Sequence, residues 1–336
     1  MEYDVYIFNE VGVKNPYSLS GTRNFTYLQT LSLGQPPKKT EDYTVQFKIE
    51  NKSPNSTLVA IPYKACNAWL PRHGWLKFSV IKNIVISGDT VTVYMYVNYI
   101  NPNGNTDLNG YRDPTATIHI FEMFDIDNQE GNFGLVIDNA TDYSKITDKS
   151  KLGFIVWSYS GVVNNAMILP SNLPNMSSQS VLAYWDHSSA VVEYDHVNNR
   201  VITNGQSVQM DIVITQGGFS PPAKLNDWGV FIFNDLGEPV LTNYYPPLKT
   251  PSYVKLGRNA VKSFDKPMVT LGQYGLFFTG STGRRRAWNA GLKMQNGAIS
   301  IASGSYAGVQ GDQKSGTGSE FYSECNVLVL NRDDYF

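Results

Sequence analysis

The stretch Val91-Thr92-Val93-Tyr94-Met95-Tyr96-Val97 decides the fold class, because β-branched and aromatic residues fill it. Such residues suit the pleated, half-buried surface of a β-sheet. Runs of the same type recur along the chain, at 5–8, 43–49, 117–121, 154–157, 208–214, 230–233, 298–301 and 326–330. By contrast, no segment of about 12 or more residues carries the apolar stripe of an amphipathic helix. The chain is therefore predicted to be all-β, with few or no helices.

Short polar turns separate these runs. Ser87-Gly88-Asp89 precedes the stretch quoted above, Asn198-Asn199 follows another strand, and Asn204-Gly205 and Asn296-Gly297 each lead into a further one. Asn and Gly tolerate the positive φ angles that tight hairpin turns require. Short strands between such turns indicate sandwiches or barrels rather than alternating strands and helices.

An internal repeat predicts how the chain is divided. Tyr3–Gly12 (YDVYIFNEVG) and Trp228–Gly237 (WGVFIFNDLG) match by residue class at nearly every position, and Phe133–Asp142 (FGLVIDNATD) is a weaker copy. Each copy combines an aromatic residue, a short apolar strand and a polar tight turn. The spacing predicts two or three β-sandwich-like units in series, with the clearest boundary at the Gly- and Pro-rich segment 217–222. The predicted units are residues 1–130, 131–222 and 223–336.

Composition excludes several classes of protein. The 336 residues carry a net charge of −2, and only 17% are charged, so binding of nucleic acid over a broad basic face is not expected. No apolar run is long enough for a membrane-spanning helix, and the N-terminal residues do not form a signal peptide. Two cysteines, Cys66 and Cys325, are predicted to be buried free thiols rather than a disulfide framework.

Motifs that carry chemistry are absent from the sequence. It contains no nucleophile elbow, no P-loop and no dinucleotide-binding fingerprint, so the chain is predicted not to be an enzyme and to need no cofactor. Asp186-His187 and Asp195-His196, with Glu193 nearby, do not have a known metal-ligand spacing. They are interpreted as a polar hairpin edge, and the acidic run 125–130 as a linker. No metal site is predicted.

Two groups of side chains are candidates for binding a partner protein or a glycan. Arg284, Arg285 and Arg286 form the one basic run, and guanidinium groups bind carboxylates and phosphates through paired hydrogen bonds. Trp288, Tyr244 and Tyr245 supply aromatic faces for stacking on sugars or anchoring a partner. A solvated loop and core aromatics are the alternative interpretations.

The repeated motif resembles a recurrent module in proteins of tailed bacteriophages that are encoded beside tail-fibre or tail-tip genes. The motif reads aromatic-Gly-(Leu/Val)-x-(Ile/Val)-(Phe/Asp)-Asn-x-x-Gly and is most complete at Trp228–Gly237. Asp4 replaces its first Gly in one copy, and Asp142 replaces its last Gly in the weaker copy. The resemblance implies a virion component at the tail. It carries over no binding residue, because the shared motif is a structural turn.

Two functions from different classes remain open. The first is a structural component of the tail tip or tail fibre, which docks other tail proteins and aids host attachment. Such a protein assembles in the host cytoplasm and is released by lysis, so it needs no signal peptide. The alternative is a carbohydrate-binding or receptor-binding protein that recognises cell-surface glycan. A homo-oligomer is compatible with both.

Overall fold

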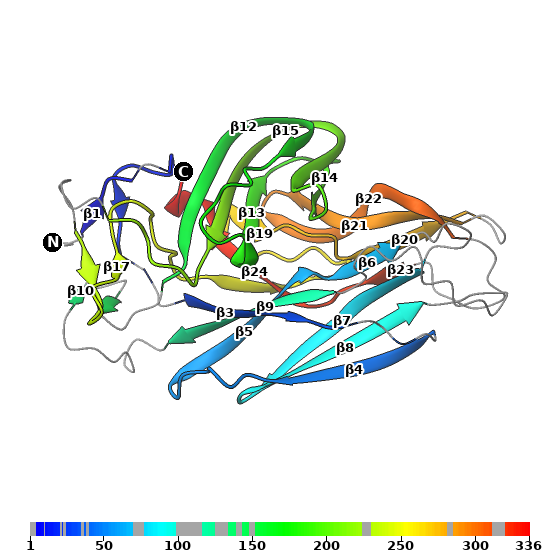
Figure 1. Ribbon diagram of the computed structural model, residues 1–336. Coiled ribbons are helices and arrows are strands. Elements are labelled where there is room, and N and C mark those ends of the chain that lie inside the picture. The colour runs from blue at the N-terminus through cyan, green and yellow to red at the C-terminus, as the bar shows by residue number, and fades with distance from the viewer. Residues whose placement is uncertain are drawn as a thin grey trace.

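A computed structural model describes residues 5–9, 11–20, 22, 25–34, 37, 40–69, 77–98, 116–124, 134–138, 143–147, 152–223, 230–280, 285–310 and 320–336. Strands make up nearly all of the regular structure in these ranges (Figure 1), and the strand pairs are antiparallel. Two single-turn 3-10 helices, η2 (Met176–Ser178) and η3 (Arg332–Asp334), are the described exceptions. The predicted all-β class is confirmed. None of the described helices is long and apolar enough to cross a membrane.

The N-terminal part of the chain forms a β-sandwich of two sheets that share one apolar core. The three-stranded sheet has the order β3 (Phe25–Ser32), β9 (Thr117–Phe124) and β5 (Ser56–Lys64). The four-stranded sheet has the order β4 (Glu41–Lys48), β8 (Thr90–Asn98), β7 (Lys77–Ser87) and β6 (Cys66–Trp69).

Strand β8 shows why this segment folds as predicted. Its apolar side chains at Val91, Val93 and Met95 are buried between the two sheets, whereas Tyr94 on the other face is 43% exposed. Side chains alternate between the two faces of a strand, so each second residue reaches the core. The turn that joins β7 to β8 contains Gly88 at φ +61°, as the Ser-Gly-Asp signal predicts.

A larger antiparallel sheet occupies most of the remaining chain. Figure 1 shows its two longest strands, β12 and β15, curling over the other strands. The order is β18 (Ser252–Lys255), β24 (Asn326–Asn331), β19 (Pro267–Thr270), β13 (Ser180–Trp185), β15 (Arg200–Gln216), β14 (Val191–Asp195), β21 (Arg285–Gln295), β20 (Gly275–Thr279) and β23 (Glu320–Tyr322). In addition, β12 (Phe154–Ile168) pairs with β15, and β22 (Ala298–Gln310) pairs with β21.

This sheet runs across the predicted boundary at 217–222. Strand β13 pairs with β15 on one side and with β19, from beyond that boundary, on the other. Strand β14 likewise pairs with β21. The core cluster beneath the sheet also contains residues from both predicted units, such as Val213 and Val329. One sheet and one core therefore contain strands from both the 131–222 and the 223–336 units. The boundary expected near residue 130 lies outside the described residues.

The dipeptide Asn204-Gly205 is an irregularity within β15, and the prediction of a turn there is wrong. Both residues have positive φ, at +52° and +78°, as a turn would require. The chain nevertheless continues along β15, and its pairing with β12 shifts opposite Asn165, whose side chain accepts a hydrogen bond from the Gly205 amide at 3.0 Å. A β-bulge satisfies the same backbone preference as a turn, so the sequence signal does not distinguish them.

Both cysteines are free and buried, as predicted. Burial raises the pKa of each thiol, of Cys66 and of Cys325, to about 12. A thiol with so high a pKa stays protonated near neutral pH, and the thiolate is the nucleophilic form. Their role is therefore to fill the core.

Candidate functional site

The repeated motif builds small two-stranded hairpins. Copies of the motif supply the first strand of each pair, and all three pairs are antiparallel. Figure 1 shows β1, β10 and β17 at the same end of the molecule. The pairs are β1 (Tyr6–Ile7) with β2 (Tyr17–Ser18), β10 (Gly134–Asp138) with β11 (Tyr143–Thr147), and β16 (Ile232–Phe233) with β17 (Pro239–Leu241).

Two copies of the motif share the same turn geometry. The Asn9 Oδ1 atom accepts a hydrogen bond from the Val11 amide at 3.1 Å, and Asn234 Oδ1 accepts one from the Leu236 amide at 3.0 Å. The closing glycines follow with φ of +81° at Gly12 and +77° at Gly237. Asparagine bonds to the backbone two residues on, and glycine adopts positive φ without strain. The corresponding turn of the weaker copy lies outside the described residues.

Large apolar side chains project from these two hairpins. Phe8 is 67% exposed and Leu236 is 80% exposed, and Tyr6 and Phe233 are exposed beside them in sequence. Single exposed apolar residues are ordinary, whereas several at one end of a molecule are typical of a contact surface. We call Tyr6, Phe8, Phe233 and Leu236 the hairpin surface.

The predicted basic and aromatic residues at 284–288 lie at the start of β21. Arg284 and the side chain of Arg285 fall outside the described residues, and Arg286 is exposed. Trp288 is half-buried; its indole donates a hydrogen bond to Thr279 Oγ1 at 3.0 Å, and its ring lies 5.5 Å from that of Tyr306. This pair offers an aromatic edge on the hairpin of β21 and β22.

The predicted Tyr244 and Tyr245 follow β17 and pack against each other edge to face, with ring centroids 4.8 Å apart. The ring centroid of Tyr245 also lies 6.1 Å from that of Phe219, and burial raises the pKa of the Tyr245 hydroxyl. Figure 1 shows β17 at the opposite end of the molecule from β20 and β23, and β20 pairs with the β21 segment that carries Arg286. The two predicted groups therefore do not form one site.

The Asp-His segments do not assemble a metal site. The Asp195 carboxylate accepts hydrogen bonds from Arg200 Nε at 2.9 Å and from Asn198 Nδ2 at 2.7 Å. Burial raises the pKa of this carboxyl, but the hydrogen bonds outweigh burial and hold the pKa below its usual range. Glu193 is buried and accepts hydrogen bonds from neutral donors, including Ser305 Oγ at 2.8 Å and Asn204 Nδ2 at 3.1 Å. Across the described ranges, no three His, Cys, Asp or Glu side chains are arranged to hold a metal ion. The acidic run 125–130 lies outside those ranges.

Sequence reasoning missed a buried cluster of histidines and tyrosines. The ring of Tyr63, on β5, lies 4.4 Å from that of His119, on β9, and 4.3 Å from that of His196, which follows β14. The cluster joins the N-terminal sandwich to the large sheet. Burial lowers the pKa of His119 to about 4 and that of His196 to about 3, so both rings are neutral near pH 7. The positive charge of Lys64, next in sequence to Tyr63, lowers the pKa of His196 further, by less than burial does. No local pattern signals residues that meet only in the fold.

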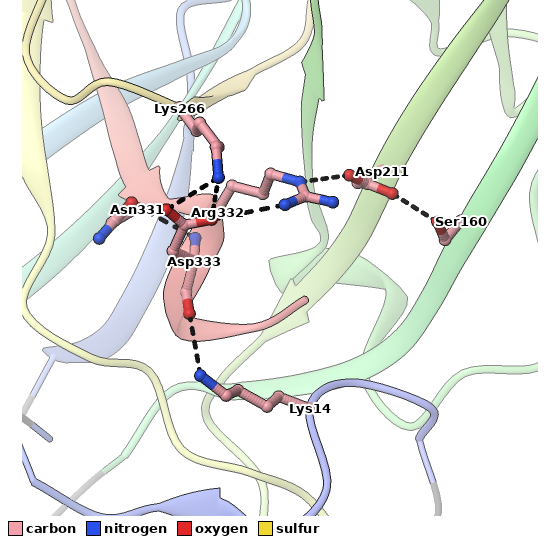
Figure 2. A network of polar contacts seen from close by, with 7 residues as sticks. All are labelled: Lys14, Ser160, Asp211, Lys266, Asn331, Arg332 and Asp333. Atoms are coloured by element: carbon pink, nitrogen blue, oxygen red, sulfur yellow. Dashed lines mark hydrogen bonds and ion pairs between the residues drawn. The ribbon is translucent and has the colours of Figure 1, made fainter.

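A polar network anchors the C-terminus (Figure 2). Arg332, in η3, donates from Nε to Asp211 on β15, and Asp211 also accepts a hydrogen bond from Ser160 on β12 at 2.6 Å. On the other side of η3, Asp333 pairs with Lys266 at 2.8 Å. The Asp333 carbonyl accepts a bond from Lys14 at 3.5 Å. These contacts connect the two ends of the chain to the large sheet, which is a structural role.

Comparison with known proteins gives one family. A family profile described as a family of unknown function (DUF6453) matches residues 6–310, which is most of the chain. No curated protein matches the chain, and no solved structure matches it.

Proposed function

We propose that the chain, which belongs to the DUF6453 family, is a non-enzymatic structural component of a bacteriophage tail. Its place is the tail tip or tail fibre, where it docks other tail proteins and aids host attachment. The observation that carries the proposal is the repeated motif that resembles the phage module. Support comes from the two described turns of the motif, Asn9–Gly12 and Asn234–Gly237, which share the asparagine hydrogen bond and a glycine with positive φ.

The hairpin surface is the part of the molecule that we assign to docking. Its four side chains are large, apolar and exposed, and burying such side chains against a partner stabilises a complex. A full burial of Phe8 or Leu236 contributes about 1.5–3 kcal/mol each. The partner is another tail protein, and assembly takes place in the host cytoplasm.

The location is tested by immunogold labelling of purified particles of the phage that encodes this chain. We expect gold at the tail tip or fibre. Particles that remain unlabelled, while an antibody against a known tail protein labels them, would show that the chain is not a tail component.

The docking surface is tested by incorporation of variants into particles. Phe8→Ser with Leu236→Ser is expected to lower incorporation at least tenfold without loss of folding, because both side chains are exposed. Val197→Ser is the matched control, since Val197 is 79% exposed but lies in the turn between β14 and β15. Equal incorporation of the double variant and the control would exclude the hairpin surface as the docking site.

A further inference from the structure

We propose that a cavity between the N-terminal sandwich and the hairpin of β16 and β17 binds a neutral saccharide. The cavity has a volume of about 660 Å³, within the roughly 300–1,000 Å³ that small-molecule sites occupy. Its walls come from β3, the start of β12, the segment 218–220 and the turn between β16 and β17. This inference does not rest on the tail proposal, because the cavity belongs to the isolated chain.

One wall of the cavity is aromatic and held in place by packing. Tyr27 and Phe219 are half-buried and line it, and the Phe219 ring centroid lies 5.6 Å from that of Phe154, which is buried and supports the wall rather than facing a ligand. Tyr27 lies beside Gly218, where a Cβ atom would be only 3.0 Å from Tyr27 Cδ1. Gly218 also has φ +70°, so glycine lets this segment lie against the tyrosine ring. The result is an aromatic surface that exists before any ligand binds.

The rim of the cavity also presents a carboxylate that a hydrogen bond orients. Asn234 Nδ2 donates a hydrogen bond to Glu238 Oε2 at 2.9 Å, and Asn234 Oδ1 accepts one from the Glu238 amide at 2.8 Å. Both residues line the cavity. The turn of the repeated motif therefore holds one carboxylate oxygen and leaves the other, Oε1, available.

Three polar groups on the rim retain unused hydrogen-bonding capacity. Within the described ranges, Glu238 Oε1 and the side chains of Asn51 and Ser220 make no hydrogen bond, and all three residues are exposed and line the cavity. A carboxylate accepts, an amide donates and accepts, and a hydroxyl does both. Together they match a ligand that carries several hydroxyl groups.

The chemistry of the walls selects among ligand classes. The apolar face of a sugar ring packs on aromatic side chains, while its hydroxyls donate to a carboxylate. None of the described residues that line the cavity is Lys, Arg or His, and the Glu238 carboxylate repels an anion. These properties favour a neutral saccharide over a phosphate or an acidic sugar.

The test is isothermal titration of the full chain with neutral trisaccharides of glucose, galactose, mannose and N-acetylglucosamine. We expect at least one of them to bind, and Glu238→Gln to weaken that binding about tenfold or more, because a hydrogen bond to a charged group is lost. The substitution keeps the shape of the side chain and an acceptor for Asn234. The matched control is Glu41→Gln, since Glu41 is exposed at the start of β4 and does not line the cavity.

The outcomes separate the proposal from its competitors. Weaker binding by Glu238→Gln and Asn51→Ala, with Glu41→Gln unchanged and all melting curves alike, supports the site. No binding by any trisaccharide overturns it, as does binding that both cavity variants retain in full. Binding of adenosine but of no trisaccharide would assign the aromatic wall to another ligand class. Labelling of phage particles is a separate measurement, so either proposal can fail alone.

Discussion

At the scale of single residues, the buried pair His119 and His196 makes the stability of the fold depend on pH. Both ring nitrogens of His196 are buried and have no hydrogen-bond partner in the described part of the chain, so a charge there is compensated only in part, by the nearby Asp195 carboxylate. His119 bonds Thr30 at 2.7 Å and the Gln179 carbonyl at 3.1 Å. The neutral forms are therefore the ones that the fold accepts.

We predict that acidification destabilises the protein below about pH 6.5. On folding, the pKa falls from 6.5 to about 4 for His119 and to about 3 for His196. As the pH falls, each histidine therefore binds a proton in the unfolded state before it does so in the folded state. The unfolded state then gains stability as pH falls from about 6.5 towards the folded-state pKa, and each ring contributes up to about 2–3 kcal/mol at pH 4.5. The measurement is the free energy of unfolding in urea at pH 7.5, 5.5 and 4.5.

The variant that isolates this effect is His196→Phe. Its aromatic neighbours Tyr63 and Tyr194 accommodate a ring, and no hydrogen bond is lost. We expect unchanged or higher stability at pH 7.5 and a smaller loss at pH 4.5. Asn83→Ala, which replaces an exposed residue that does not titrate, should keep the full pH dependence. If the free energy of unfolding falls equally with pH in His196→Phe and in the unmodified protein, His196 is not a cause of the acid sensitivity.

At the scale of elements, the turn asparagine of the repeated motif stabilises its hairpin. Asn9 is buried; its Oδ1 accepts from Val11 at 3.1 Å, and its Nδ2 donates to the Lys14 carbonyl at 3.3 Å. Asn9→Ala should cost about 1–2 kcal/mol and speed hydrogen exchange in β1 and β2. Asn83→Ala is the control, because Asn83 is exposed on β7. Equal exchange in both variants would show that the turn forms without its asparagine.

The strands could be predicted because their signal is local. Val91–Val97 lies inside β8 (Thr90–Asn98), and Gly88 and Gly297 have the positive φ that their turns require. The pairing could not be predicted in the same way. Strand β13 meets β19 through Leu182 and Thr270, which are far apart in sequence, and residue types alone do not select one antiparallel partner among many.

The candidate sites were harder to predict than the strands. Trp288 and Tyr245 were singled out by residue type, yet each packs against a neighbour in its own part of the fold. The cavity residue Glu238 stands in no recognisable motif, because its role depends on the Asn234 turn and on β3 across the cavity. A site assembled from distant segments leaves no characteristic residue spacing that a sequence motif could detect.

At the scale of the whole molecule, contacts join the N-terminal sandwich to the large sheet. A small apolar cluster unites Cys66 and Phe78 with Leu276 and Phe278. The backbone adds a bond from the Cys66 amide to the Gln273 carbonyl at 3.1 Å. The histidine cluster lies in the same junction. Units that share apolar clusters and backbone bonds are expected to unfold together rather than in series.

The network around Asp211 tests that cooperativity within the large sheet. Asp211 is buried and bonds Arg332 and Ser160, so Asp211→Ala leaves the Arg332 guanidinium without its main partner and should cost about 2–3 kcal/mol. Asp42→Ala removes an exposed ion pair to Lys82 and should change stability by no more than about 0.5 kcal/mol.

Hydrogen exchange of these two variants tests whether the 131–222 and 223–336 units unfold together or separately. Because β13 bonds to both β15 and β19, Asp211→Ala should lower protection in strands on both sides of residue 222 by a similar factor. Suppose that β18, β19 and β24 lose protection from exchange while β12, β13 and β15 keep it in full. The 131–222 and 223–336 units would then be separate cooperative units despite their shared sheet. Joint opening would mean that the three copies of the motif mark hairpins at one end of a continuous structure rather than the starts of independent domains.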